Sequence, residues 1–267
     1  MNTDYSFNAR QLLAACTVFF LAPALRLVPG AAARIAGRAA WLSVLLALPP
    51  VLAYIIFIRS FLSRREDGEG LGELVRRSLG LHAARAMLAL LAAWFLLYGS
   101  FMLRSGAERI VTTMYPNAGA ELFIVTMGAL AFIAALDCAR TLVRAANLFL
   151  VTVLGVLFIV LFFALFSLQR DNLLPLTLPD FPGAAQGALA ALDVTVTPVY
   201  IMCFLPGLRR GASGALRAGL MWGVGMTALL AWLMADILGM FGAELTSRLT
   251  HPFFMLVKNL VFFKNLE

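Results

Sequence analysis

The sequence is poor in charged residues, in cysteine and in histidine. Charged side chains make up 13% of its 267 residues, whereas soluble domains contain about 25%. Apolar residues make up 62%, which is more than the core of a soluble domain of this length can hold. Within lipid the backbone must satisfy its own hydrogen bonds, and long apolar runs do so as helices. The chain is therefore predicted to be an all-α integral membrane protein that contacts the lipid bilayer.

The scarcity of reactive side chains excludes several functions. The three cysteines, Cys16, Cys138 and Cys203, form no CxxC motif and predict no disulfide framework. The two histidines, His82 and His251, are far apart and have no cluster of metal ligands near them. No nucleophile is paired with a base. The glycine-rich segment formed by Gly68, Gly70 and Gly72 lacks the spacing of a nucleotide-binding loop. We therefore predict no metal, no cofactor and no enzymatic activity. The arginines punctuate apolar stretches instead of forming a stripe, so no nucleic-acid partner is expected.

Seven apolar stretches are long enough to cross a bilayer, which takes about 20 helical residues. Between the second and the third, residues 60–84 are the most polar part of the chain, with a short surface helix predicted over Leu71–Leu81. The tail, 246–267, is amphipathic and is predicted to lie at the membrane interface. The whole chain, 1–267, is predicted to form one transmembrane domain. The spans are expected at about 11–30, 39–59, 84–113, 119–137, 143–168, 185–206 and 213–240.

Prolines and glycines mark the expected bends and contacts of these spans. Pro49-Pro50 predicts a kink in the second span, because neither residue donates a backbone hydrogen bond. Gly219, Gly223 and Gly225 give the seventh span a small-residue face that suits close contact with another helix.

The sixth span contains polar and helix-breaking residues near its centre, namely Asp193, Thr195, Thr197 and Pro198. A carboxylate near the middle of the bilayer costs about 2.5–3.5 kcal/mol on insertion scales. Pro198 lacks the amide hydrogen that a helix would use, which leaves a carbonyl one turn back in need of a partner. Such a span is predicted to be shaped around a polar ligand. The alternative is a kinked packing helix whose Asp193 hydrogen-bonds a neighbour.

The first span is interrupted in a similar way, by proline in Ala22-Pro23-Ala24, and stands five spans before the sixth. Two broken spans at this separation are typical of transporters built from inverted repeats, whose half-helices meet at the middle of the membrane. Half-helix N-termini suit a carboxylate, and unwound carbonyls suit an ammonium group. The pair predicts a site for a zwitterionic amino acid, although prolines are also common in membrane helices without such a site.

Three further polar residues within predicted spans are candidates for the same cavity or for proton coupling. Tyr98 could line the cavity, with core packing or an interfacial anchor as the alternative. Arg104 could contact a ligand, or it could form an ion pair with Glu108 one turn later. Asp236 is a second acid within a span; like Asp193 it could carry a proton, and its alternative is a hydrogen bond to a neighbouring helix.

Basic residues set the expected orientation. With the N-terminus inside, more than half of the 21 basic residues fall on the cytoplasmic side, which favours a cytoplasmic N-terminus. The first thirty residues could also be read as a signal peptide. The apolar run from Leu12 is about 19 residues long, however, whereas signal-peptide cores have about 7–15, so a first membrane span is favoured.

Several short segments along the whole chain form an ordered pattern, in which no single motif is diagnostic. They are Ala9-Arg10-Gln11-Leu12, Pro29-Gly30, Ala40-Trp41-Leu42-Ser43, residues 103–110, residues 139–145, Asn172-Leu173-Leu174-Pro175, residues 251–258 and residues 262–267. In this order they resemble the spore-germination permease family. These proteins are the B subunits of nutrient germinant receptors and belong to the amino acid/polyamine/organocation transporter superfamily.

The resemblance implies a ten-span fold of two inverted five-span repeats with broken helices one and six, of which this chain carries the first part, about seven spans. It implies a germinant pocket lined by spans one, three, six and eight, near Ala22-Pro23-Ala24, Tyr98 and Asp193–Pro198. It also implies assembly with A and C receptor subunits in the plasma membrane or spore inner membrane.

Two features depart from the family pattern. The chain has Pro116-Asn117-Ala118 where the family usually has a Thr-Pro, and it ends at Glu267 where the family continues into three more spans. It is therefore expected to be C-terminally truncated, as a fragment, a truncated gene product or a degenerate member.

These observations favour a nutrient-sensing subunit that binds a small germinant, an amino acid, and signals to partner subunits. A proton-coupled amino acid transporter is the alternative, because both functions need the same cavity. A structural or channel subunit that binds no nutrient is a third interpretation.

Overall fold

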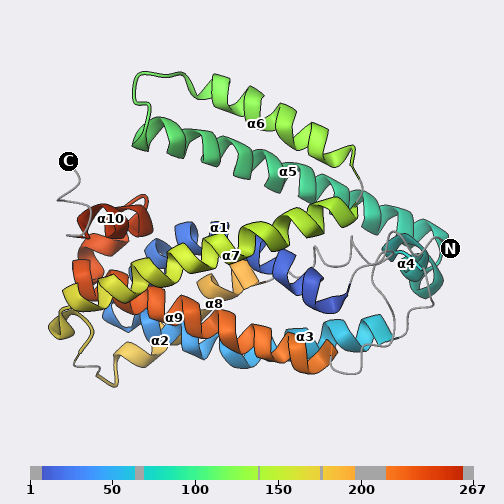
Figure 1. Ribbon diagram of the computed structural model, residues 1–267. Helices are drawn as coiled ribbons and strands as arrows, with labels where there is room; N and C mark the ends of the chain where they lie inside the picture. The colour runs from blue at the N-terminus through green and yellow to red at the C-terminus, as the bar shows by residue number, and fades with distance from the viewer. Residues whose placement is uncertain (1–7, 64–68, 138, 175–176, 196–214, 261–267) are drawn as a thin grey trace. The chain divides into compact units, whose positions relative to one another are not determined.

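The computed structural model describes residues 8–63, 69–137, 139–174, 177–195 and 215–260 (Figure 1). All secondary structure in these ranges is helical, and the chain divides into two compact units. Unit 1 contains α4 (Leu71–Leu79), α5 (Leu81–Thr113) and α6 (Ala120–Ala135). Unit 2 contains α1 (Ala9–Ala36), η2 (Gly37–Ala39), α2 (Ala40–Leu46), α3 (Leu48–Ser63), most of α7 (Ala139–Ala164), η3 (Leu165–Ser167), η4 (Arg170–Asn172), α8 (Asp180–Thr195), α9 (Ala215–Arg248) and α10 (Pro252–Asn259).

Four helical stretches of the described chain are long and apolar enough to cross a membrane. One of them, Arg10–Ser60, includes both the first and the second predicted span, and α6 is apolar but shorter. The prediction of an all-α membrane protein is confirmed. The other three stretches are Leu81–Thr113, Thr141–Ser167 and Leu216–Arg248.

The first helix, α1, is continuous over 28 residues and contains both Pro23 and Pro29. The predicted interruption of the first span at Pro23 is therefore wrong. A proline removes one backbone donor and frees one carbonyl, but a helix packed on its neighbours can tolerate this loss. Pro23 and Ala24 are both buried, so packing holds the helix together where an isolated segment would be free to unwind.

The second span behaves as its two prolines predict. Helix α2 ends at Leu46 and α3 begins at Leu48, just before Pro49-Pro50. The hydrogen bonds continue across the junction, since Ala47 N–H donates to Ser43 O and Val51 N–H donates to Ala47 O, both at 3.1 Å. The predicted kink is confirmed, and it is a local change of direction within one apolar stretch.

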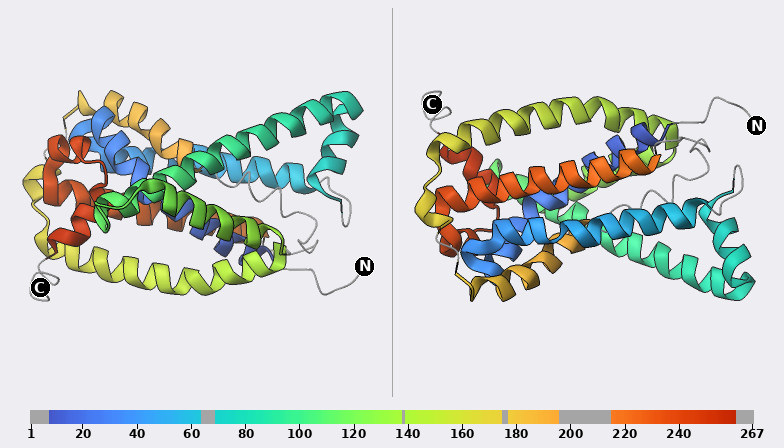
Figure 2. Two further views of the ribbon diagram at one scale, coloured as in Figure 1. Left: turned by 90° about the horizontal axis from the view of Figure 1, so that it is seen from above. Right: turned by 90° about the horizontal axis from the view of Figure 1, so that it is seen from below.

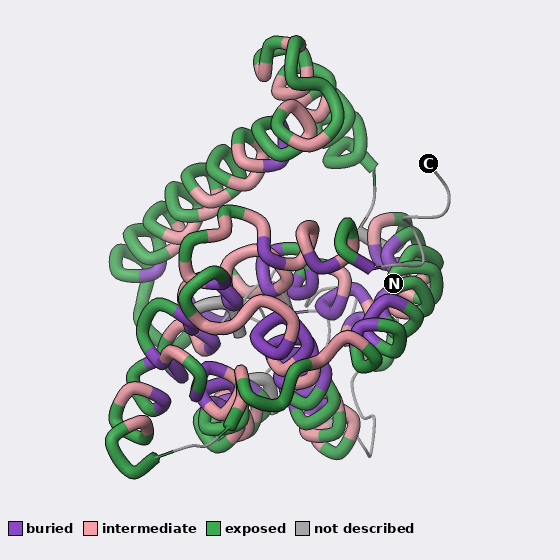
Figure 3. Tube along the Cα trace, turned by 90° about the vertical axis from the view of Figure 1, so that its left-hand side faces the viewer, coloured by how far each residue is buried: buried purple, intermediate pink, exposed green. Residues whose placement is uncertain are grey.

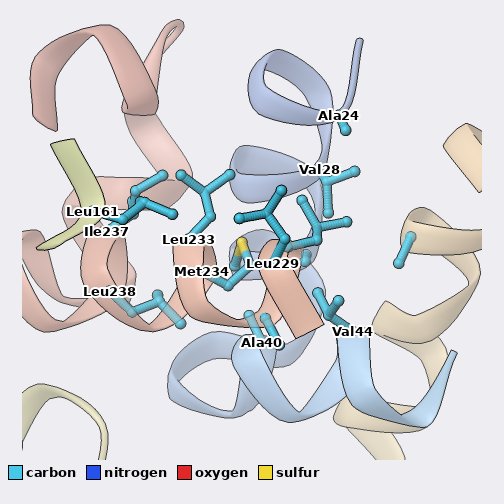
Figure 4. Packing of buried hydrophobic residues seen from close by; sticks show 14 of the residues in the cluster. Ala24, Val28, Ala40, Val44, Leu161, Leu229, Leu233, Met234, Ile237 and Leu238 are labelled. Atoms are coloured by element: carbon cyan, nitrogen blue, oxygen red, sulfur yellow. The ribbon is translucent and has the colours of Figure 1, made fainter. Parts of the chain in front are cut away.

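Within unit 2, α1 and α2 pack against α8 and α9, and α3 packs along α9. In the right-hand view of Figure 2, α9 lies between α7 and the α2–α3 pair. Figure 4 shows Val28 of α1, Val44 of α2, Leu161 of α7 and Met234 of α9 converging in one core, and each of them is at most 1% exposed. Spans one and two are thereby brought together with spans six and seven.

Two glycines one turn apart allow α8 to approach its neighbours closely. A Cβ atom on Gly187 would lie 2.6 Å from Ser43 Oγ of α2, and one on Gly183 would lie 3.3 Å from the carbonyl oxygen of Ile35 of α1. Lipid tails are as apolar as leucine, so helices in a membrane associate through such close fits more than through burial of apolar surface. Gly183 and Gly187 therefore set the position of α8.

A second pair of glycines brings α9 against α3. A Cβ atom would lie 3.1 Å from the Ile55 side chain if it were added to Gly219, and 2.7 Å if it were added to Gly223. The predicted small-residue face of the seventh span is confirmed for these two positions. It is wrong for Gly225, which is exposed and would have no neighbour within 4 Å of its Cβ, because the contact follows i, i+4 spacing on one face of the helix.

Unit 1 consists of two apolar helices and one short amphipathic helix. Helix α6 packs on α5, where Tyr115 stacks on Phe123 with ring centroids 5.8 Å apart. Most side chains of α5 and α6 are exposed, as the green segments of these helices in Figure 3 show, whereas buried residues gather in unit 2. The surface helix predicted over Leu71–Leu81 is confirmed as α4, whose Leu74 and Val75 are buried.

Candidate functional site

Unit 2 contains a small cavity where α1, α2, α3, α8 and α9 meet. Its volume is about 10 Å³, which is room for about one water molecule. The lining includes Phe20 of α1, Val44 of α2, Ala191 of α8 and Trp222 of α9, and the hydroxyl of Thr227 is among its few polar groups. The cavity is thus a narrow apolar space beside the last described turn of α8.

One side of the cavity is held by contacts between α1 and α9. The indole Nε1–H of Trp222 donates a 2.8 Å hydrogen bond to Thr17 Oγ1, which in turn donates to the carbonyl oxygen of Leu13 at 3.0 Å. The rings of Trp222 and Phe20 meet edge to face with centroids 6.1 Å apart. These contacts join residues about 200 positions apart in the sequence and fix spans one and seven to each other.

The predicted site residues of the first span lie on different sides of α1. Pro23 and Ala24 are buried, with Ala24 inside the core, whereas Ala22 is exposed. Because α1 is continuous, it presents no half-helix terminus at Pro23. The expectation that both broken spans offer helix ends to a ligand is therefore wrong for the first of them, and any such ends must come from the sixth span.

The predicted site residues of the sixth span are only partly described. Asp193 and Thr195 lie in the last turn of α8, two and four positions after the cavity residue Ala191. Their side chains, and Thr197 and Pro198 altogether, lie outside the described residues. Since α8 packs against α1, the backbone of this turn and the buried face of α1 belong to the same unit. Tyr98 is half-buried on α5 of unit 1.

Arg104 forms an ion pair with Glu108, with its Nε 2.8 Å from Glu108 Oε1. Both side chains are more than half exposed, and they lie one turn apart on α5. This is the alternative that the i, i+4 spacing offered. The guanidinium group of Arg104 is therefore engaged within its own helix.

Asp236 is completely buried within α9, and neither of its carboxylate oxygens has a hydrogen-bond partner in the described part of the chain. One turn earlier, Trp232 packs on Phe158 of α7. Three residues later, Gly239 lies against Leu168. These positions share a helix face, so Asp236 faces the C-terminal end of α7. The alternative of a hydrogen bond to a neighbouring helix is not found there, and an unpaired ionised carboxylate is among the most costly groups to bury.

Helix α9 contains a break that sequence reasoning missed. Gly242 has φ 72° and ψ 167°, which lies outside the helical region. Thr246 Oγ1 donates to the carbonyl oxygen of Gly242 at 2.7 Å, and Gln169 N–H and Asn172 Nδ2 both donate to that of Gly239, at 3.1 and 2.8 Å. The carbonyls freed by the break are thus bound by side chains and by the turn 165–173. The segment Asn172-Leu173-Leu174-Pro175 of the family pattern was the sequence feature that pointed to this contact.

Another segment of the family pattern secures the start of α1. The side-chain oxygen of Gln11 accepts a 3.0 Å hydrogen bond from the backbone N–H of Asn8 and so caps the helix. Asn147 Nδ2 of α7 donates to the backbone carbonyl of Gln11 at 3.0 Å. The described residues contain no group of three or more His, Cys, Asp or Glu that could hold a metal ion.

The helical fold and the long apolar helices define an integral membrane protein. The model of the spore germination protein family matches residues 7–267. The chain belongs to this family of spore germination permeases. No curated protein and no solved structure matches it.

Proposed function

We propose that this chain is the nutrient-sensing B subunit of a spore germinant receptor. In this proposal it binds a small germinant, an amino acid, in a pocket at the middle of the membrane and signals to A and C subunits. It resides in the spore inner membrane with its N-terminus in the cytoplasm. Membership of the spore germination family supports the biological role.

The observation that carries the proposed site is the meeting of α1, α2, α8 and α9 at a cavity beside Ala191. The sequence places a carboxylate, Asp193, in the last turn of α8, and in this proposal it pairs with the ammonium group of an amino acid. Phe20 of α1 lines the cavity, and Pro23 and Ala24, one turn further along the same buried face, would extend its apolar wall. Within this unit the proposed pocket residues are Pro23, Ala24, Asp193, Thr195, Thr197 and Pro198, whereas Ala22 lies on the exposed side of α1. Because the cavity holds only about one water, it must widen when a ligand enters.

Ligand-dependent thermal stabilisation of the assembled receptor tests this proposal. The chain is co-expressed with A and C subunits, and the melting temperature of the purified complex is measured with each of the common amino acids. At least one should raise it, since a ligand that binds only the folded state stabilises that state. D193N should raise the amino acid concentration needed for this stabilisation at least tenfold. The control E244Q, which removes an exposed carboxylate of α9, should leave that concentration unchanged. If no amino acid raises the melting temperature, the sensing proposal is wrong.

A second candidate function is a proton-coupled amino acid transporter, and the observation that favours it is the unpartnered, buried Asp236. A carboxyl group that alternately binds and releases a proton is typical of membrane transporters, and Asp193 is a second candidate for this role. The test is amino acid uptake into vesicles driven by a pH gradient, which D236N or D193N should abolish and R104Q should leave intact. Wild-type vesicles that show no gradient-dependent uptake would remove this function without affecting the binding test.

A further inference from the structure

The junction of α4 and α5 is a corner with a defined outer surface. Gly70 and Gly80 cap the two ends of α4. The N–H of Gly70 donates a 3.1 Å hydrogen bond to the carboxylate of Glu73. Gly80 has φ 80° and turns the chain into α5, a conformation that glycine adopts readily. Leu74 and Val75 are buried, and α4 packs on α5, so the other face of α4 is directed outward.

The charge pattern of α5 places this corner at the edge of the membrane. The segment 86–103 contains no charged residue, and Arg85 and Arg104 flank it. At about 1.5 Å per helical residue the segment is about 27 Å long, close to the roughly 30 Å of a bilayer's hydrocarbon core. Arg85 therefore marks one edge of that core. A Cβ atom on Gly72 would lie 3.7 Å from Leu88 Cδ1, which places α4 at the same level.

The outer surface of the corner combines basic and apolar side chains. Arg76, Arg77 and Arg85 are exposed, and so are Leu79 and Leu81, at 55% and 39%. The one acidic residue of α4, Glu73, lies in its first turn, where its carboxylate is bound to Gly70 N–H. An amphipathic helix with arginines beside leucines suits the interface, where the leucines reach acyl chains and the guanidinium groups reach phosphates.

We propose that the α4–α5 corner, formed by Arg76, Arg77, Leu79, Leu81 and Arg85, binds the headgroups of anionic membrane lipids. Each basic residue close to an anionic surface strengthens such binding about fivefold, and the attraction fades beyond about one Debye length from the surface. Leu79 and Leu81 distinguish a lipid from a free phosphate, because only a lipid offers acyl chains to them. This proposal does not depend on germinant sensing.

The test measures lipid preference of the full chain in mild detergent by native mass spectrometry. The wild-type chain should retain phosphatidylglycerol over phosphatidylcholine, and R76Q/R77Q should lower the affinity for phosphatidylglycerol roughly thirtyfold. The control R104Q/R248Q removes the same charge from two exposed arginines outside the corner and should retain the preference. The charge-preserving variant R76K/R77K should keep at least half of the wild-type preference for phosphatidylglycerol. This variant separates lipid binding from a folding defect.

Three results would overturn the proposal. The wild-type chain could bind both lipids equally, R76Q/R77Q could keep its preference, or inorganic phosphate at millimolar concentration could displace phosphatidylglycerol completely. The last result would show that the corner recognises phosphate without recognising a membrane. Loss of the preference in R104Q/R248Q with retention in R76Q/R77Q would place the lipid site elsewhere.

Discussion

Asn172 Nδ2 donates a 2.8 Å hydrogen bond to the carbonyl oxygen of Gly239, 67 residues later in the sequence. The backbone N–H of Gln169 donates to the same oxygen at 3.1 Å. The turn 165–173 therefore supplies both donors to a carbonyl that lies next to the break in α9 at Gly242. This contact links the turn after α7 to the distal part of α9 by polar bonds.

Removing the Asn172 side chain should destabilise unit 2. N172A takes away one of the two donors to Gly239 O, and a single hydrogen bond contributes about 1 kcal/mol. Denaturant unfolding in micelles, followed by helical circular dichroism, measures the loss. N259A is the matched control, because Asn259 Nδ2 donates to Met255 O within its own exposed turn and to no distant residue in the described part of the chain. If the two substitutions lowered the free energy of unfolding equally, the long-range bond would contribute no more than a bond within one helical turn.

Replacing Gly242 by alanine should also be destabilising, for a different reason. At φ 72° and ψ 167° a residue with a Cβ atom is strained, and the cost is about 1–3 kcal/mol. The same unfolding experiment applies. G225A is its control, since Gly225 is a helical position with open space around its Cβ, where alanine should raise stability by up to about 1 kcal/mol. A G242A protein as stable as wild type would mean that α9 can close its break.

The contact between α8 and α2 predicts a coupling between Gly187 and Ser43. G187A should cost about 1–3 kcal/mol by overpacking, because its Cβ would lie 2.6 Å from Ser43 Oγ. In the double variant G187A/S43G the clash with Ser43 is removed, so the total loss should be smaller than the sum of the two single losses. G155A, at a glycine of α7 with no neighbour, should not be destabilising. Strict additivity of the two changes would contradict the contact.

Asp180 at the start of α8 predicts a pH dependence. Its pKa is lowered from the usual 3.8 mainly by a hydrogen bond from the backbone N–H of Thr177, and further by one from the Thr177 hydroxyl. A lowered pKa contributes stability above the unfolded-state value and loses it as the pH falls through the folded-state value. The melting temperature of wild type should therefore exceed that of D180N at neutral pH, and the difference should begin to shrink near the usual 3.8 and vanish once the pH has fallen through the lowered folded-state value.

The control for this dependence is T177V, which keeps the backbone donor and removes only the hydroxyl. In the T177V background, D180N should still lower the melting temperature at neutral pH by most of the original amount. The reason is that the backbone bond is the larger cause of the lowered pKa. A difference between wild type and D180N that persists unchanged in acid would show that Asp180 acts by packing and not by charge.

Local rules in the sequence were sufficient for several features. The kink before Pro49-Pro50, the contact face of Gly219 and Gly223, and the Arg104–Glu108 pair each depend on residues within one or two turns. The all-α membrane fold follows from composition alone, because lipid permits few other solutions.

Features that depend on contacts between residues far apart in the chain could not be predicted from the sequence. Pro23 was expected to break α1, but packing with α8 and α9 keeps the helix intact. Gly242 is one of 21 glycines, and nothing local distinguishes it; its break is satisfied by Gln169 and Asn172, from a turn far earlier in the chain. At the candidate site, the sequence identified Asp193 and Asp236 as costly, but the unpartnered burial of Asp236 could be recognised only from the packing around it.

The central position of α9 also limits how this family can vary. In the apolar window of α9, 61% of the residues are buried, compared with 22% in that of α7. An exposed position of α7 has few protein neighbours in the described part of the chain, and a lipid neighbour accepts any apolar side chain, so drift there is almost free. A position between 229 and 239 of α9 meets protein on every side, and a change there requires a compensating change in a neighbour. Among relatives, α7 should therefore diverge residue by residue, whereas α9 should change in correlated pairs with α1, α2 and the turn 165–173.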